Sequence, residues 1–190
     1  MQAELRERLT EVFRWTDPGP DSTHLVSDPS GWWRDPEILA EIGPALAAPF
    51  RTDRPTVVIA PEVTGLLLGP LVAVALGVGF VPAYKNIGGR RIAEPTTWAE
   101  TAPDHRGRSL ALGVRDRHLR AGDRALVVDD WVATGAQVRA VYELIAVRGA
   151  QVLGTSALVA ECPPEVTREL RLHSLLAAAE LNSDRPSDHP

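Results

Sequence analysis

The stretch that decides the fold is "RALVVDDWVATGAQ", residues 124–137. Its uninterrupted apolar run, residues 125–128, predicts a buried strand. Asp129 and Asp130 follow at the C-terminal end of that strand, and a short turn containing Gly135 leads into the next predicted helix. Because two adjacent carboxylates repel each other and are costly to bury, they imply a cation or a ligand rich in hydroxyl groups.

The turn that follows the two aspartates has the features of an anion site. The backbone N–H groups of residues 132–136 and the N-terminus of the following helix can bind a phosphate. Thr134 adds a hydroxyl group, and Gly135 permits a positive φ and a close approach of the backbone. A sugar phosphate with free hydroxyl groups would fit the aspartates and the turn together.

Strands and helices alternate along most of the chain. We expect strands at residues 56–60, 80–84, 109–114, 125–128, 152–160 and 172–176, and helices at residues 2–15, 36–48, 65–76, 137–147 and 164–170. This order predicts an α/β fold with a mostly parallel central sheet flanked by helices, and ligands that bind beyond the C-terminal strand ends. Residues 17–31 and 86–104 are predicted to be loops.

The chain of 190 residues is expected to form one domain. Residues 1–50 would supply N-terminal helices and a hood segment, residues 51–182 the core, and residues 183–190 a flexible tail.

Composition excludes several classes of protein. The net charge of −5 argues against a general nucleic-acid binder, and the single cysteine excludes an internal disulfide. The N-terminus does not resemble a signal peptide, so a cytoplasmic location is expected. Residues 65–84 carry no charge and are long enough for a membrane span, but Gly77 and Gly79 divide them, which favours a buried helix, turn and strand.

The segment "LVVDDWVATG" resembles the binding motif for phosphoribosyl pyrophosphate (PRPP) of type I phosphoribosyltransferases. In that family the paired acids hold the ribose hydroxyl groups and the turn binds the 5′-phosphate. The resemblance implies the first role for Asp129 and Asp130, as catalytic residues. It implies the second role for Ala133, Thr134, Gly135, Ala136 and Gln137. Family members usually carry Thr or Ser where Gln137 stands.

The upstream segment "VVIAPEVTGLLLGPLVAVALGVGFVPAYK" is similar to adenine phosphoribosyltransferases. The similarity implies a pyrophosphate-binding loop, often with a cis non-proline peptide bond, formed by Glu62, Val63, Thr64 and Gly65. Thr64 replaces the arginine that is typical of the family.

Three cations lie at the end of this segment and just after it. Lys85 matches the family's basic residue, and Arg90 and Arg91 lie in the next loop. All three would face the pyrophosphate leaving group, and Lys85 and Arg90 are the candidates for a catalytic role. Solvated surface charge is the alternative for each of them.

The segment "GWWRDP" loosely matches the base-binding segment of the adenine-specific enzymes. Trp33 and Arg34 would then contact the base, with Trp131 as the floor of its pocket, although packing in the core or at a dimer contact explains Trp33 equally well. No glutamate aligns with the family's acid–base residue, and Glu100 and Asp104 are weaker candidates.

These features predict a Mg²⁺-dependent phosphoribosyltransferase. It would transfer the phosphoribosyl group from PRPP to a nucleobase, with an adenine-like purine expected, and release pyrophosphate. Asp129 and Asp130 would face Mg²⁺ indirectly, through PRPP. A homodimer is implied, with no nucleic-acid or membrane partner. The alternative is a non-catalytic PRPP-binding regulatory protein, which Thr64 and the missing glutamate favour.

Overall fold

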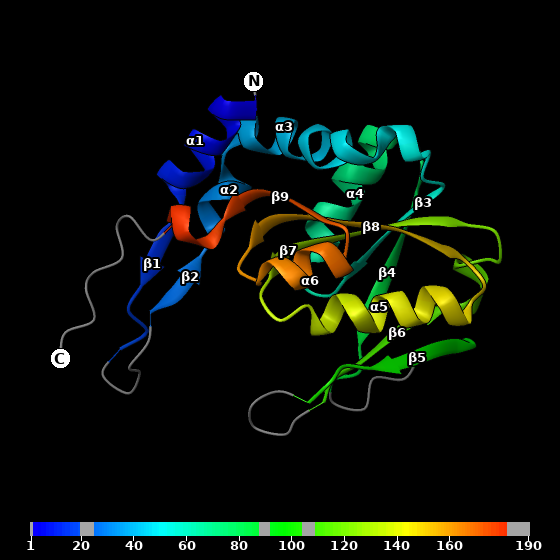
Figure 1. The fold of residues 1–190 in the computed structure, drawn as a ribbon. Helices are drawn as coiled ribbons and strands as arrows, with labels where there is room; N and C mark the ends of the chain where they lie inside the picture. Colours follow the sequence, from blue (N-terminus) through cyan, green and yellow to red (C-terminus); the bar gives the residue numbers. More distant parts are fainter. Residues whose placement is uncertain (1, 20–24, 88–91, 104–108, 182–190) are drawn as a thin grey trace.

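The computed structural model describes residues 2–19, 25–87, 92–103 and 109–181 (Figure 1). Its helices are α1 (Gln2–Val12), α2 (Ser30–Arg34), α3 (Pro36–Ala47), α4 (Gly65–Leu76), α5 (Ala136–Val147) and α6 (Pro164–Glu169). Its strands are β1 (Arg14–Thr16), β2 (Val26–Asp28), β3 (Val57–Pro61), β4 (Gly79–Lys85), β5 (Thr96–Glu100), β6 (Ala111–Arg115), β7 (Arg124–Val132), β8 (Gln151–Ala160) and β9 (Leu172–Ala177). Short 3-10 helices follow α3, β6 and β9.

A seven-stranded sheet in the order β5-β6-β4-β3-β7-β8-β9 forms the centre of the molecule. The neighbours from β4 through β3, β7 and β8 to β9 are parallel, whereas β6 runs antiparallel to both β4 and β5. Every residue of β3 is buried, as expected of a strand that is covered on both faces. The predicted mostly parallel sheet flanked by helices is therefore confirmed.

Helices cover both faces of this sheet (Figure 1). On one face α3 and α4 pack over a core that includes Leu46, Leu68 and Leu126. On the other face α5 packs over a second core that includes Val127 and Leu144. Because helices occupy both faces, the turns at the strand ends remain as the place for a ligand site.

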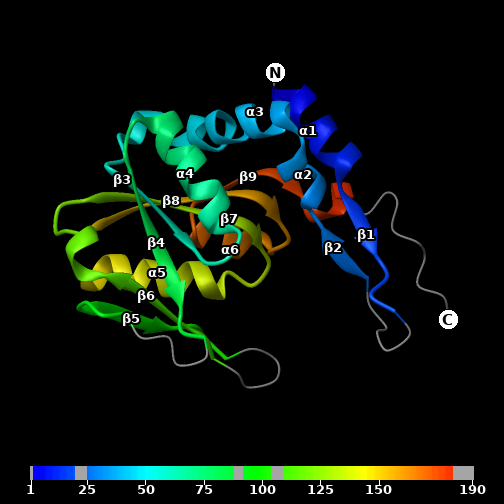
Figure 2. The same ribbon diagram turned by 180° about the vertical axis from the view of Figure 1, so that it is seen from behind.

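The N-terminal segment packs on the first of these cores. Leu5 of α1 and Trp32 of α2 are almost fully buried in it. The β1–β2 hairpin extends beside them (Figure 2), and the Trp15 indole N–H donates to the Leu181 carbonyl at 2.9 Å. This bond joins β1 to the last described residue of the chain.

Three sequence predictions need correction. The first helix ends at Val12 instead of residue 15, because residues 14–16 pair with residues 26–28. The predicted loop at residues 17–31 therefore contains β2 and the start of α2. The predicted loop at residues 86–104 contains β5, which forms by pairing with β6.

The uncharged stretch at residues 65–84 forms α4, a short turn and most of β4, which is the predicted helix, turn and strand. Gly77 ends α4 with a φ of 71°. In the part of the chain that the structure describes, no helix is long and apolar enough to cross a membrane.

Candidate active site

The two aspartates lie within β7, because this strand runs to Val132 and the predicted strand ended at residue 128. Pairing with β8 continues through Asp129, Trp131 and Val132, which face Ala157, Val159 and Ala160. Asp129 is buried, with 5% of its surface exposed, whereas Asp130 is half-buried. Asp129 Oδ1 accepts the backbone N–H of Asp130 at 3.0 Å.

Burial raises the pKa of the Asp129 carboxyl well above its usual range. The neighbouring charge of Asp130 raises this pKa further, and the backbone hydrogen bond and the Lys85 ammonium group oppose the shift. The carboxyl group is therefore held at an energetic cost in the free protein. A ligand that supplies hydroxyl donors or positive charge would remove that cost.

The turn after β7 exposes donors at the start of α5. Gly135 adopts a φ of 75° at the N-cap of α5, and no side chain caps this helix end. The Thr134 hydroxyl group accepts the Ala136 N–H at 3.3 Å. Other first-turn N–H groups of α5 lack an intrahelical partner, so they can bind an anion.

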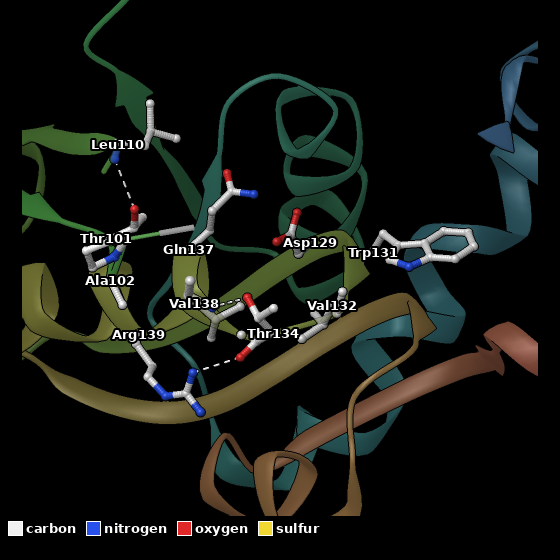
Figure 3. Close-up of a pocket in the computed structure, with 14 residues that line it drawn as sticks. Thr101, Ala102, Leu110, Asp129, Trp131, Val132, Thr134, Gln137, Val138 and Arg139 are labelled. Carbon is white, nitrogen blue, oxygen red and sulfur yellow. Dashed lines mark hydrogen bonds between the residues drawn. The ribbon is translucent and has the colours of Figure 1, made fainter. Parts of the chain in front are cut away.

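A cavity of about 510 Å³ opens over this turn (Figure 3). Its lining comprises Thr101, Ala102, Pro103, Leu110, Asp129, Trp131, Val132, Ala133, Thr134, Gly135, Ala136, Gln137, Val138 and Arg139. It thus joins a buried carboxylate to an uncapped helix N-terminus. All five residues predicted to bind the 5′-phosphate are among those that line it.

The predicted pyrophosphate loop connects β3 to α4. The peptide bond between Glu62 and Val63 is cis, as the family resemblance implies. The Glu62 carboxylate accepts the backbone N–H of Lys85 at 2.9 Å, and the Glu62 N–H donates to the Ala83 carbonyl at 2.9 Å. These bonds fix the loop to the end of β4. Thr64 and Gly65 then begin the first turn of α4.

Trp131 lines the cavity, but its ring points toward the N-terminal segment, away from Thr134 (Figure 3). Its indole N–H donates to the Glu161 carboxylate at 2.7 Å, and its ring lies 6.3 Å from the rings of Phe13 and Trp15. The Trp131 ring is therefore held in place at the edge of the site.

Trp33 and Arg34 are not among the described residues that line the cavity. Trp33 is half-buried against the core beside Trp32, at a ring distance of 6.2 Å, and Arg34 is exposed at the end of α2. The packing alternative for Trp33 therefore accounts for its contacts in the free protein.

Several candidates lie elsewhere or are not described. Arg90, Arg91 and Asp104 fall outside the described residues. Glu100 is exposed at the end of β5.

The sequence prediction missed the cavity-lining residues Thr101, Pro103, Leu110 and Arg139. The first two follow β5, which was itself missed. Arg139 lies four residues after Gly135, one helical turn away, and this spacing could have identified it.

Comparison with known proteins agrees with this geometry. A model of the phosphoribosyl transferase domain matches residues 34–168. The adenine phosphoribosyltransferase of Streptomyces coelicolor is 35% identical over 158 residues, which cover 82% of this chain and 80% of that protein. The corresponding protein of Myxococcus xanthus is 32% identical over 92% of this chain and 91% of that protein.

Among solved structures, the adenine phosphoribosyltransferase of Rhodothermus marinus superposes with a TM-score of 0.77. It shares 25% sequence identity, and the match covers 92% of this chain and 99% of that one. The fold, the motif of β7 and its turn, and the extent of these matches agree, and the chain belongs to the phosphoribosyltransferase family.

Proposed function

We propose that this protein transfers the 5-phosphoribosyl group of PRPP to a ring nitrogen of adenine or a similar purine and releases pyrophosphate. One observation carries the proposal. The same cavity joins the buried Asp129 carboxyl to the uncapped N-terminus of α5, and these are the two halves that a ribose 5-phosphate needs. The relatives named above, which are adenine phosphoribosyltransferases, support the choice of base.

In the proposed reaction the bond between C1′ and the pyrophosphate oxygen breaks, and a bond from C1′ to the base nitrogen forms. The proton on that nitrogen leaves to solvent or to the departing pyrophosphate. Asp129 and Asp130 would orient the ribose and stabilise the positive charge that develops on it. Ala133, Thr134, Gly135, Ala136 and Gln137 would hold the 5′-phosphate.

The pyrophosphate would lie against the loop formed by Glu62, Val63, Thr64 and Gly65 and against Lys85. Thr64 replaces the arginine that is typical of the family. The positive end of the α4 helix dipole would supply part of the positive charge that this arginine would bring to the pyrophosphate. Lys85 would stabilise the leaving group. Catalytic and pyrophosphate-binding roles for Arg90 and Arg91 stay predictions from the sequence.

Mg²⁺ is part of the proposal as an ion that arrives with PRPP. The described residues contain no group of three or more His, Cys, Asp or Glu side chains that could hold a metal. Asp129 and Asp130 supply carboxylate oxygens beside the proposed ribose site, and Mg²⁺ is often held by one or two carboxylates together with substrate phosphates. These residues fit an ion bound indirectly, whose charge would offset that of the diphosphate.

The base would lie against the Trp131 ring, which Phe13 and Trp15 hold in place from the N-terminal segment. Stacking on an aromatic ring is worth about 1–3 kcal/mol per base. Contact of Trp33 and Arg34 with the base would require them to turn toward the cavity when the ligand binds. A structure with adenosine monophosphate tests whether Trp131, Trp33 or neither covers the base.

A homodimer belongs to the proposal as well. Helix α4 carries no charged residue, and Leu67 and Val74 on it are 52% and 82% exposed. Val63, just before α4, and Ile87, just after β4, are also exposed, at 66% and 62%. A second copy of this chain would bury these side chains beside the pyrophosphate loop.

The predicted division of the chain at residues 50 and 182 and the predicted cytoplasmic location stay predictions.

The experiment is to incubate the protein with PRPP, Mg²⁺ and a panel of nucleobases and to measure pyrophosphate release. We expect release with adenine and little or none with pyrimidines. A non-catalytic PRPP-binding protein is the second candidate, favoured by Thr64 in the loop. PRPP binding without turnover of any base would establish that candidate instead.

A further inference from the structure

Arg139, on the second turn of α5, connects the turn after β7 to a separate helix. Its Nη1 donates to the Thr134 carbonyl at 2.8 Å (Figure 3), and its Nε and Nη2 donate to the two carboxylate oxygens of Glu169 at 2.7 Å each. Such a forked contact fixes the guanidinium plane as well as its position. Arg139 thereby joins a turn backbone to the end of α6.

The same part of α6 packs directly against Gly135. A Cβ atom built on Gly135 would lie 2.8 Å from Leu170 Cδ1, 3.2 Å from Val166 Cγ1 and 3.3 Å from Arg139 Nη1. The Leu170 carbonyl in turn accepts the Tyr142 hydroxyl group at 2.5 Å. The Gly135 end of the turn is therefore enclosed by the α6 region and by the Arg139 side chain.

Local support for the turn is weak by comparison. The N-cap residue Gly135 has no side chain to cap α5, and the Thr134 hydroxyl group accepts the Ala136 N–H at the long distance of 3.3 Å. The Gln137 Oε1 atom is buried and has no hydrogen-bond partner among the described residues. A phosphate site built from backbone N–H groups is only as well ordered as the backbone that carries them.

The ion pair itself contributes little to overall stability. The side chains of Arg139 and Glu169 are 40% and 52% exposed, and water screens ion pairs at such positions. The bond to the Thr134 carbonyl is different, because it acts on a residue of the proposed phosphate site.

We propose that Arg139 is a positioning residue that holds the 5′-phosphate turn in its binding geometry by linking the Thr134 carbonyl to Glu169. This inference rests on the proposed function, because the turn is taken to bind the 5′-phosphate. In this role Arg139 acts through the backbone of the turn.

The test compares Arg139→Gln with Arg148→Gln. Arg148 is a matched control at the other end of α5, where it donates to the Asp116 carbonyl at 2.9 Å and lies 3.7 Å from the Asp116 carboxylate, outside the cavity. Ribose 5-phosphate binding is measured by titration calorimetry, and amide hydrogen exchange of residues 133–137 is measured without ligand. Loss of the link at Arg139 should weaken ribose 5-phosphate binding by about tenfold and speed exchange in the turn.

Arg148→Gln should leave both measurements at wild-type values, although it removes a similar set of bonds. Unchanged affinity and exchange in Arg139→Gln would overturn the inference, as would equal effects in the two variants. If the wild-type protein bound no ribose 5-phosphate, the proposed function would fail. The hydrogen exchange comparison would still decide in that case whether Arg139 orders the turn.

Discussion

Asp129 illustrates at the scale of one residue how a group of the proposed binding site is buried at the expense of stability. Its carboxyl group is buried next to another carboxylate, and its pKa is raised above the usual value of 3.8. The folded protein therefore retains a proton that the unfolded chain releases. The contribution of this protonated carboxyl group to the free energy of unfolding is complete below the pKa of the unfolded chain. It is lost as the pH rises through the higher pKa of the folded protein.

Asp129→Asn should reverse this loss, because an amide group carries no charge to bury. At neutral pH, in EDTA and without ligand, we expect the variant to unfold with a free energy about 1–3 kcal/mol higher than the wild type. The difference should shrink toward pH 4. PRPP affinity should fall at least tenfold, because the proposed contact to the ribose hydroxyl groups is lost. Urea unfolding at several pH values and PRPP titration provide the two measurements.

Asp123→Asn is the control for this substitution. Asp123 lies just before β7, and its carboxylate accepts the Thr56 hydroxyl group at 3.0 Å and the Arg120 N–H at 2.8 Å. Its replacement should lower stability or leave it unchanged and should not alter PRPP affinity. If Asp129→Asn is less stable than the wild type at every pH, the ionised carboxyl group stabilises the free protein and our interpretation is wrong.

At the scale of secondary structure, the unit formed by β7, its turn and α5 depends on Gly135. The positive φ at this position strains any residue with a side chain, and an added Cβ would meet Leu170 and Val166 of the α6 region. Gly135→Ala should lower the free energy of unfolding by about 1–3 kcal/mol and abolish measurable ribose 5-phosphate binding. Urea unfolding and calorimetric titration measure the two effects.

Gly149→Ala separates the backbone effect from the effect on the site. Gly149 follows α5 at its other end with a similar φ of 72°, and an added Cβ would lie 3.3 Å from the Ala121 side chain, outside the cavity. This variant should lose about 1 kcal/mol of stability and keep its affinity. Equal affinities in the two glycine variants would contradict the assignment of the turn as the phosphate site.

The same scale shows what the sequence could predict and what it could not. Residues 65–76 form a helix at the predicted bounds, because an apolar run flanked by glycines contains its own start and stop signals. Residues 96–100 were missed, since that strand lies between glycine- and proline-containing segments and exists through its pairing with β6. Likewise, β7 extends past the aspartates only because β8 pairs with it there.

The candidate site divides in the same way. Asp129 and residues 133–137 could be placed from one contiguous motif, and the structure brings them into one cavity. The link from Arg139 to Glu169 spans thirty positions and two helices, so no local pattern reveals it. Trp131 was identified from its neighbours in the chain, whereas its contacts with Phe13 and Trp15 come from the opposite end of the sequence.

At the scale of the whole molecule, the exposed face of α4 is the feature that a monomer explains least. Leu67 and Val74 fall at helical spacing on one side of the uncharged α4, Val63 lies just before this helix, and all three are more than half exposed. Exposed apolar side chains that share one face commonly mark an interface. The other side of α4 packs against α3 and the sheet, so its exposed side is open to a second copy.

Val74→Glu should convert the proposed dimer into a monomer, because two copies of the new carboxylate would be buried in the contact. Sedimentation velocity at micromolar concentration would detect the halved mass. Val147→Glu is the matched control, since Val147 is 64% exposed at the end of α5, on the opposite face of the sheet, and this variant should remain dimeric. A wild-type protein that sediments as a monomer at every concentration would contradict the proposed homodimer. A Val74→Glu variant that remains dimeric would place the contact on another face.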